Sequence, residues 1–129
     1  MEKDNTMLKA IYKQMDRCNE ILNKKFEEYG NHEDPFWHFE RAAGMLGGTR
    51  ELALMHLFAK HLTCIVEMAE DPDSYSGGQW NEKLTDAINY LLILSAMVDE
   101  TCGEDVPEVE FTAVLSPQQV IEQIAKGEK

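Results

Sequence analysis

The sequence is poor in basic residues: its 129 residues include 12 Lys or Arg against 24 Asp or Glu, a formal net charge of -12. Proteins that bind nucleic acids neutralise phosphates with clustered basic side chains, so a surface this acidic would repel a phosphate backbone. We therefore expect no duplex DNA or RNA as partner. With 43% hydrophobic and 28% charged residues, the composition is that of a folded globular domain and not of a disordered chain.

Cysteine is scarce as well, and long apolar runs are missing. Cys18, Cys64 and Cys102 lie far apart and form no Cys-x-x-Cys pair, which favours reduced thiols over disulfides or a zinc site. The longest apolar stretch, Ala87 to Val98, is too short to cross a membrane. No basic segment followed by an apolar one marks a secretory signal near the N-terminus. We expect a cytoplasmic protein without a membrane contact.

Apolar residues recur every three or four positions, which is the pattern of amphipathic helices. The pattern predicts four helices: Asn5 to Tyr29, ended by Gly30 and Asn31; Asp34-Pro35 to Leu46; Thr49, as the cap, to about Glu70; and about Gln79 to Thr101, ended by Gly103. The fourth is apolar on nearly every side, which predicts a central helix with neighbours all round.

The fold class that follows is all-α, a bundle of four to five helices over residues 1–103. Residues 104–129 are predicted to form a C-terminal tail, partly extended because Val106 to Leu115 is rich in β-branched residues. Ser116-Pro-Gln-Gln119 then has the form of a capping box that begins a short helix.

Polar residues interrupt the apolar helices on one side. At about 100° per residue, Glu82, Asp86 and Asn89 share a narrow sector of the fourth helix. Lys60 and Glu67 align in the same way on the third helix, together with His56. If the two helices pack with these sectors facing, their carboxylates converge on a divalent cation, Mg²⁺ or Mn²⁺. The predicted metal ligands are Glu67, Glu82 and Asp86.

Simpler interpretations of the same residues stay open. Carboxylates in the first turn of a helix, such as Glu82, often only complement the helix dipole. The amide of Asn89 needs partners inside an apolar helix, but a hydrogen bond in the core would also satisfy it. His56 and His61 are candidate bases, although histidines on a helix face of mixed polarity are more often structural.

Four segments together resemble a known family: Lys25-Phe-Glu-Glu-Tyr29-Gly30-Asn31, Phe36 to Ala43, Ala59-Lys60-His61, and Glu82-Lys-Leu-Thr-Asp86-Ala-Ile-Asn89-Tyr90. They resemble the MazG-like, or nucleotide-modification-associated, proteins of phages and prophages, which belong to the all-α nucleoside triphosphate pyrophosphohydrolase superfamily. The resemblance extends from Asn5 to Thr101. It implies a helical bundle, a homodimer or larger homo-oligomer, bound Mg²⁺, and cleavage of a nucleotide between its α and β phosphates.

The resemblance also implies roles for individual residues. Glu67 and Glu70 look like the Glu-x-x-Glu of the superfamily, and Glu82 with Asp86 stands where its Glu-x-x-Asp would be, with one extra residue between them. For the hydrolase hypothesis, the candidate base is Glu70, and the alternative is that the reaction uses no base. The residues expected to contact the nucleotide or its phosphates are Lys25, Tyr29, Lys60 and Asn89.

Two functions remain at this point. The first is a Mg²⁺-dependent pyrophosphohydrolase acting on a (d)NTP or a modified nucleotide, in which Lys60 offsets phosphate charge and a water attacks the α-phosphorus. The second is a helical binding or scaffold protein of a phage or prophage that keeps this fold without catalysis. The altered spacing of Glu82 and Asp86 favours the second.

Overall fold

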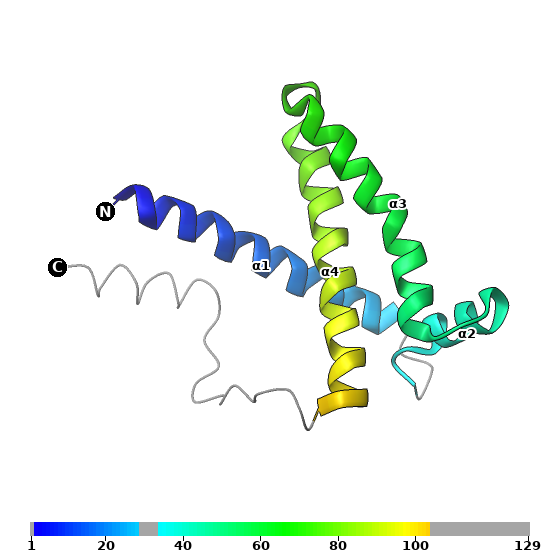
Figure 1. Ribbon diagram of the computed structural model, residues 1–129. Helices are drawn as coiled ribbons and strands as arrows, with labels where there is room; N and C mark the ends of the chain where they lie inside the picture. Colours follow the sequence, from blue (N-terminus) through cyan, green and yellow to red (C-terminus); the bar gives the residue numbers. More distant parts are fainter. Residues whose placement is uncertain (1, 29–33, 104–129) are drawn as a thin grey trace, which may run out of the picture.

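The computed structural model describes residues 2–28 and 34–103, and every regular element within these ranges is helical. The elements are α1 (Glu2–Glu28), α2 (Trp37–Leu46), α3 (Arg50–Glu70), the short 3₁₀ helix η1 (Pro72–Ser74) and α4 (Gly77–Cys102). The predicted all-α bundle is thereby confirmed (Figure 1). The predictions for Tyr29, for Gly30 and Asn31, and for the tail 104–129 lie outside the described residues.

Local chemistry accounts for the helix ends. The Thr49 side chain accepts a hydrogen bond from the Leu52 amide at 3.1 Å, as predicted for the start of α3. Ser76 and Gln79 form a reciprocal capping box, so α4 begins two residues earlier than predicted. The predicted start of α2 at Asp34-Pro35 was wrong, because the helix begins at Trp37. The Asp34 side chain accepts a hydrogen bond from the Phe36 amide at 2.9 Å within the turn that precedes the helix.

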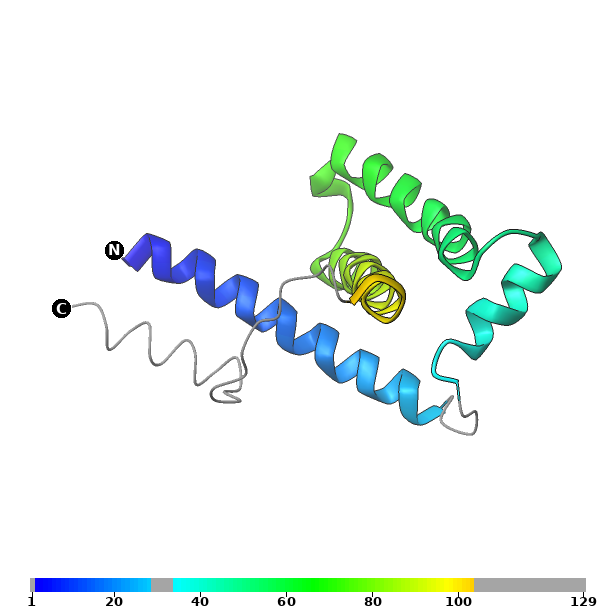
Figure 2. The ribbon, with the colours of Figure 1, turned by 60° about the horizontal axis from the view of Figure 1, so that its bottom comes forward.

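The helices form an open arrangement built on one helical hairpin. α3 and α4 run side by side in opposite directions, joined through η1, while α2 packs against α3 and α1 packs against α4. Figures 1 and 2 agree that α1 crosses α4 and that its N-terminal half projects beyond the hairpin. The core lies where α2, α3 and α4 meet, around Phe36, Leu54 and Met97.

Arg50 holds this junction together. Its side chain, 12% exposed, lies within 3.4 Å of the carboxylates of Glu40 on α2 and Glu51 on α3 and of Glu100 on α4. Its guanidinium also donates to the Met97 carbonyl and lies 4.8 Å from the centre of the Phe36 ring. One cation therefore links three helices.

The prediction that the fourth helix is covered on all sides was wrong. Leu91 and Leu92 are each 48% exposed, and Val98 is 40% exposed. Among the described elements, the backbones of α1 and α3 approach α4 closely, whereas α2 contributes side chains at one end of the core. A continuous apolar surface is left open.

α3 bears on the expectation that no segment is long and apolar enough to cross a membrane. Its 21 residues are long and apolar enough to cross a membrane by length and composition, with a mean hydropathy of 1.3 in an 18-residue window of which 22% is buried. A mostly buried core helix of a soluble protein passes the same test; α3 packs Leu54, Phe58 and Met68 inward and leaves most of this window exposed. His56, Lys60 and Glu67 are exposed on another side of it.

Candidate functional site

Three polar links join α1 to α4. The Gln14 amide donates to the Thr85 hydroxyl at 2.8 Å, and the Asn89 amide nitrogen donates to the Cys18 carbonyl at 3.2 Å. Further along, the Lys25 ammonium lies 3.7 Å from an Asp86 carboxylate oxygen. The polar sector of α4 found in the sequence therefore faces α1.

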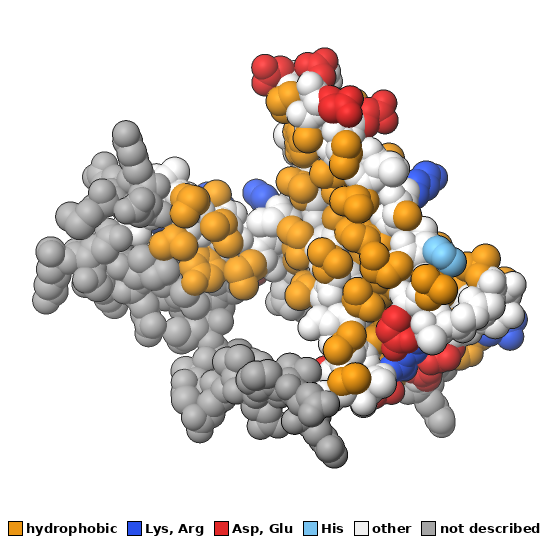
Figure 3. All heavy atoms as spheres, viewed as in Figure 1, with side chains coloured by type: hydrophobic (Ala, Val, Ile, Leu, Met, Phe, Trp, Pro, Cys, Tyr) orange, Lys and Arg blue, Asp and Glu red, His pale blue; other side chains and the backbone are white. Residues whose placement is uncertain are grey.

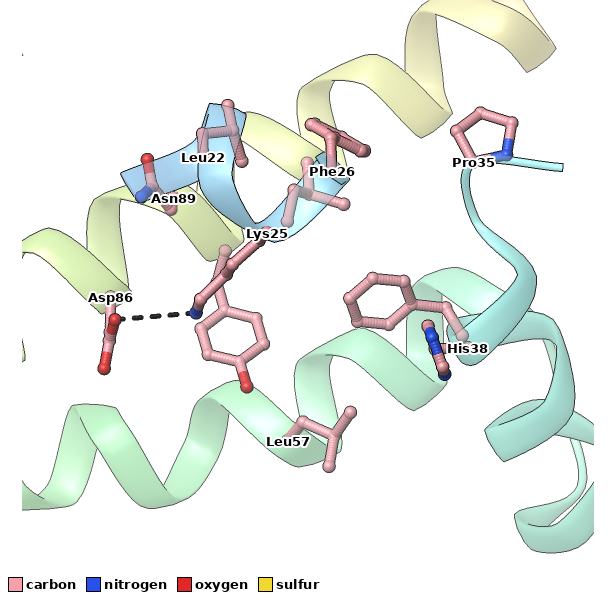
Figure 4. Close-up of a pocket in the computed structure, with 11 residues that line it drawn as sticks. Leu22, Lys25, Phe26, Pro35, His38, Leu57, Asp86 and Asn89 are labelled. Atoms are coloured by element: carbon pink, nitrogen blue, oxygen red, sulfur yellow. Dashed lines mark ion pairs between the residues drawn. The ribbon is translucent and has the colours of Figure 1, made fainter. Parts of the chain in front are cut away.

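A pocket with a volume of about 280 Å³ opens beside these links. Helices α1 to α4 all contribute to it, and its walls are largely apolar (Figure 4). The lining residues with polar groups are Lys25, His38, Asp86, Asn89 and Tyr90. The remaining lining residues are Leu22, Phe26, Pro35, Phe39, Leu57 and Ile93. Apolar walls with a few convergent polar groups are the usual form of a small-molecule site.

Asn89 is the least expected member of this lining. It is 2% exposed, and its Oδ1 atom has no hydrogen-bond partner although its Nδ2 atom is used. An unpaired buried carbonyl oxygen costs about 1–3 kcal/mol, and such atoms are uncommon in folded proteins. An N–H or O–H group that reaches this atom would remove the cost.

The Tyr90 ring is held in place from the side of α3. It lies 6.0 Å from the Phe58 ring and 5.1 Å from the His61 ring, between centroids. Rings at such distances pack favourably and restrict one another. His61 is thus part of the packing behind the pocket wall, where its Nδ1 atom is buried and has no hydrogen-bond partner.

The structure brings together three of the residues predicted from sequence. Lys25, Asp86 and Asn89 line the same pocket. Glu82 is exposed and shares an adjacent hollow with Asp86, between α1 and α4. The predicted residues of α3, namely Lys60, Glu67 and Glu70, are exposed and line neither hollow.

The polar sectors of α3 and α4 do not face each other within one chain, contrary to the packing considered from the sequence. α3 turns Leu54, Phe58 and Met68 inward because burying these side chains gains more than burying Lys60 and Glu67 would. Within residues 2–28 and 34–103, no three His, Cys, Asp or Glu side chains lie close enough to hold a metal ion. The Mg²⁺ site stays a prediction.

Sequence reasoning missed the other half of the pocket. His38 and Phe39 come from α2, and Leu57 comes from α3. Their spacing in sequence resembles that of ordinary helix faces, so only the arrangement of the helices around the pocket reveals them. Tyr90 was part of the motif that suggested the family, and this adjacency to Asn89 was the available signal.

Comparison of the chain with protein-family models, with curated proteins and with solved structures finds no match.

Proposed function

We propose that the protein binds a nucleotide in the pocket between α1 and α4. The observation that carries the proposal is a largely apolar pocket whose lining includes Lys25, Asp86 and Asn89, the last of which has a buried Oδ1 atom without a hydrogen-bond partner. A nucleotide combines the three features that such a pocket accepts: a flat apolar ring, hydrogen-bond donors on that ring or on the sugar, and an anionic group.

The ring would lie against the apolar walls. Phe26, Phe39 and Leu57 come from three different helices. The whole pocket has a volume of about 280 Å³, just below the usual range for small-molecule pockets. Asn89 Oδ1 is buried in the empty pocket, so a small shift of the lining would let it accept a hydrogen bond from the ring or the sugar. This bond replaces solvation that Asn89 lost when the chain folded, so it favours ligands that carry a donor.

The phosphates would lie toward Lys25 and Asp86. A chain of net charge -12 repels phosphates, so phosphate binding requires a positive charge close by. Lys25 carries one, and its ammonium lies 3.7 Å from Asp86. Asp86, with Glu82 one turn before it in the adjacent hollow, has the donor chemistry for Mg²⁺, which proteins hold through one or two carboxylates and substrate phosphates. When bound, Mg²⁺ would supply charge neutralisation and Lewis acidity.

Pyrophosphohydrolysis is the activity we propose for this site, as the family resemblance implies. Water would form a bond to the α-phosphorus while the bond to the bridging oxygen breaks, giving a monophosphate and pyrophosphate. A noncatalytic nucleotide-binding or scaffold protein is the second candidate. The observation that favours it is that Glu67 and Glu70 lie apart from Asp86 within one chain.

Calorimetric titration with each (d)NTP, with and without Mg²⁺, tests binding, and chromatography of the products tests turnover. We expect Mg²⁺-dependent binding and release of pyrophosphate. Lys25→Met should weaken triphosphate binding about tenfold, since one close charge is lost. Lys24→Met is the matched control, because Lys24 is the exposed neighbour on α1 and does not line the pocket.

The outcomes separate the candidates. Binding without turnover by any nucleotide selects the noncatalytic protein. No binding of any nucleotide, or equal loss in the Lys24 and Lys25 variants, overturns the assignment of the pocket.

A further inference from the structure

An apolar surface on the α3–α4 hairpin stays open among the described elements. Its side chains gather along both helices on the side seen in Figure 3, whereas α1 crosses α4 on the opposite side. The members on α3 are 39% to 54% exposed: Leu52, Met55, Leu62 and Val66. The members on α4 are 36% to 48% exposed: Ile88, Leu91 and Val98. We call this surface the hairpin face.

We propose that residues 116–126 of the same chain bind the hairpin face as a further helix. These residues lie outside the described part of the chain, and their sequence is Ser-Pro-Gln-Gln-Val-Ile-Glu-Gln-Ile-Ala-Lys. Pro117, Val120, Ile121 and Ile124 recur at positions i, i+3, i+4 and i+7, which is the pattern of one apolar helix face. A helix this short is not stable alone in water, so it requires an apolar surface to pack against.

The hairpin face has the form that such a helix requires. Amphipathic helices with anchors at i, i+3, i+4 and i+7 bind to apolar surfaces that other helices present. α3 and α4 run side by side, so a third helix can contact both at once. A shallow hollow follows α4 from Leu91 to Asp99, near the end of the helix from which the chain continues toward residue 116.

The chain between α4 and residue 116 is long enough for this contact. α4 ends at Cys102, and its 26 residues rise about 39 Å. Residues 104–115 can span up to about 40 Å when extended. The connection therefore reaches any member of the hairpin face from the end of α4.

The covalent connection favours this segment over a second molecule as the occupant. A segment joined by a short linker has an effective concentration of about a millimolar, far above that of a second chain in dilute solution. Charge does not oppose the contact although the chain carries -12, because residues 116–126 contain one acidic and one basic residue. An anionic lipid surface, in contrast, would meet Glu70, Asp71 and Asp73, which are exposed at the end of the hairpin (Figure 3).

Hydrogen–deuterium exchange of the full chain, measured by mass spectrometry over a range of protein concentrations, tests the proposal. We expect the amides of residues 120–126 to exchange at least about tenfold more slowly than in the free peptide, equally at every concentration. Leu91→Glu and Val66→Glu should remove this protection, because each places a charge under the docked helix. Both side chains are already about half exposed, so neither substitution disrupts the core.

Ile121→Glu should remove the protection from the other side of the contact. Gln119→Glu is its matched control, because residue 119 lies about 160° from Ile121 around the helix. This control also keeps the capping box with Ser116, which accepts Glu or Gln at that position. Met45→Glu is the matched control for the hairpin face, since Met45 is 78% exposed on α2 and lies off that face. Both controls should keep the protection.

The proposal is independent of the nucleotide pocket, which lies on the side of α1. Nucleotide affinity should be the same in Ile121→Glu as in the native chain, so the two proposals can fail separately.

Four results would overturn this segment as the occupant. Two of them are rapid exchange of residues 120–126 in the native chain, and protection that survives Leu91→Glu and Val66→Glu. Protection that appears only as the protein concentration rises would assign the face to a second copy. Protection that appears only with phosphatidylcholine–phosphatidylglycerol vesicles would assign it to a membrane.

Discussion

Replacing Asn89 by leucine should separate ligand binding from stability. The substitution removes one hydrogen bond, from Asn89 Nδ2 to the Cys18 carbonyl at 3.2 Å, which contributes about 1 kcal/mol. It also removes the buried Oδ1 atom that has no partner, whose desolvation costs about 1–3 kcal/mol. Leucine has the same branched side-chain skeleton, although it is larger, and needs no partner. The free energy of unfolding should therefore stay equal or rise by up to about 2 kcal/mol.

Nucleotide affinity should fall in the same variant, by at least about tenfold, because the acceptor on the pocket wall is gone. Urea unfolding followed by circular dichroism measures the stability, and calorimetry measures the affinity. A gain in stability together with a loss of binding is typical of a residue kept for a ligand and not for the fold.

Thr85→Val provides the matched comparison. Thr85 is 4% exposed on the same interface, but its hydroxyl accepts from Gln14 at 2.8 Å and donates to Asn81 at 3.3 Å. Valine would leave the Gln14 amide without that partner, so this variant should lose about 1–2 kcal/mol. If Asn89→Leu instead loses as much as Thr85→Val, Asn89 is structural and the argument for the pocket fails.

Three further predictions concern the ion pairs. Arg50→Met should lower the free energy of unfolding by about 2 kcal/mol, because it breaks contacts to carboxylates on three helices. The loss is limited because those carboxylates stay partly hydrated. Denaturant unfolding that finds no loss would contradict the role of Arg50 in joining the helices. A hydrogen bond from its own backbone amide, followed by one from Arg50, lowers the pKa of Glu51 below 4.5. Its contribution to stability should thus be present above pH 4.5 and disappear as the pH falls through the lowered pKa, so acid unfolding of Glu51→Gln should be less steep than that of the native chain. Asp86→Asn should abolish Mg²⁺ binding in calorimetry and leave the melting temperature unchanged or higher, because the exposed pair with Lys25 contributes little; a marked drop in melting temperature would make Asp86 structural.

The helices themselves follow from the sequence because their causes are local. Periodic apolar residues predicted α1 to α4, and Thr49 predicted where α3 begins. The adjacency of Asp86 and Asn89 on one face of α4 could also be derived, since about 100° per residue leaves no alternative once the helix forms. In these cases residues a few positions apart carry the whole argument.

The neighbours of each face were decided only by tertiary packing. The polar sector of α4 contacts Gln14, Cys18 and Lys25 on α1. The sequence of α4 alone does not predict that this sector packs against α1 and not against α3. The pocket likewise exists because α2 brings His38 and Phe39 to the space that α1 and α4 also line. Amphipathic faces specify that something must cover them, but the choice of partner depends on the summed burial of all helices at once.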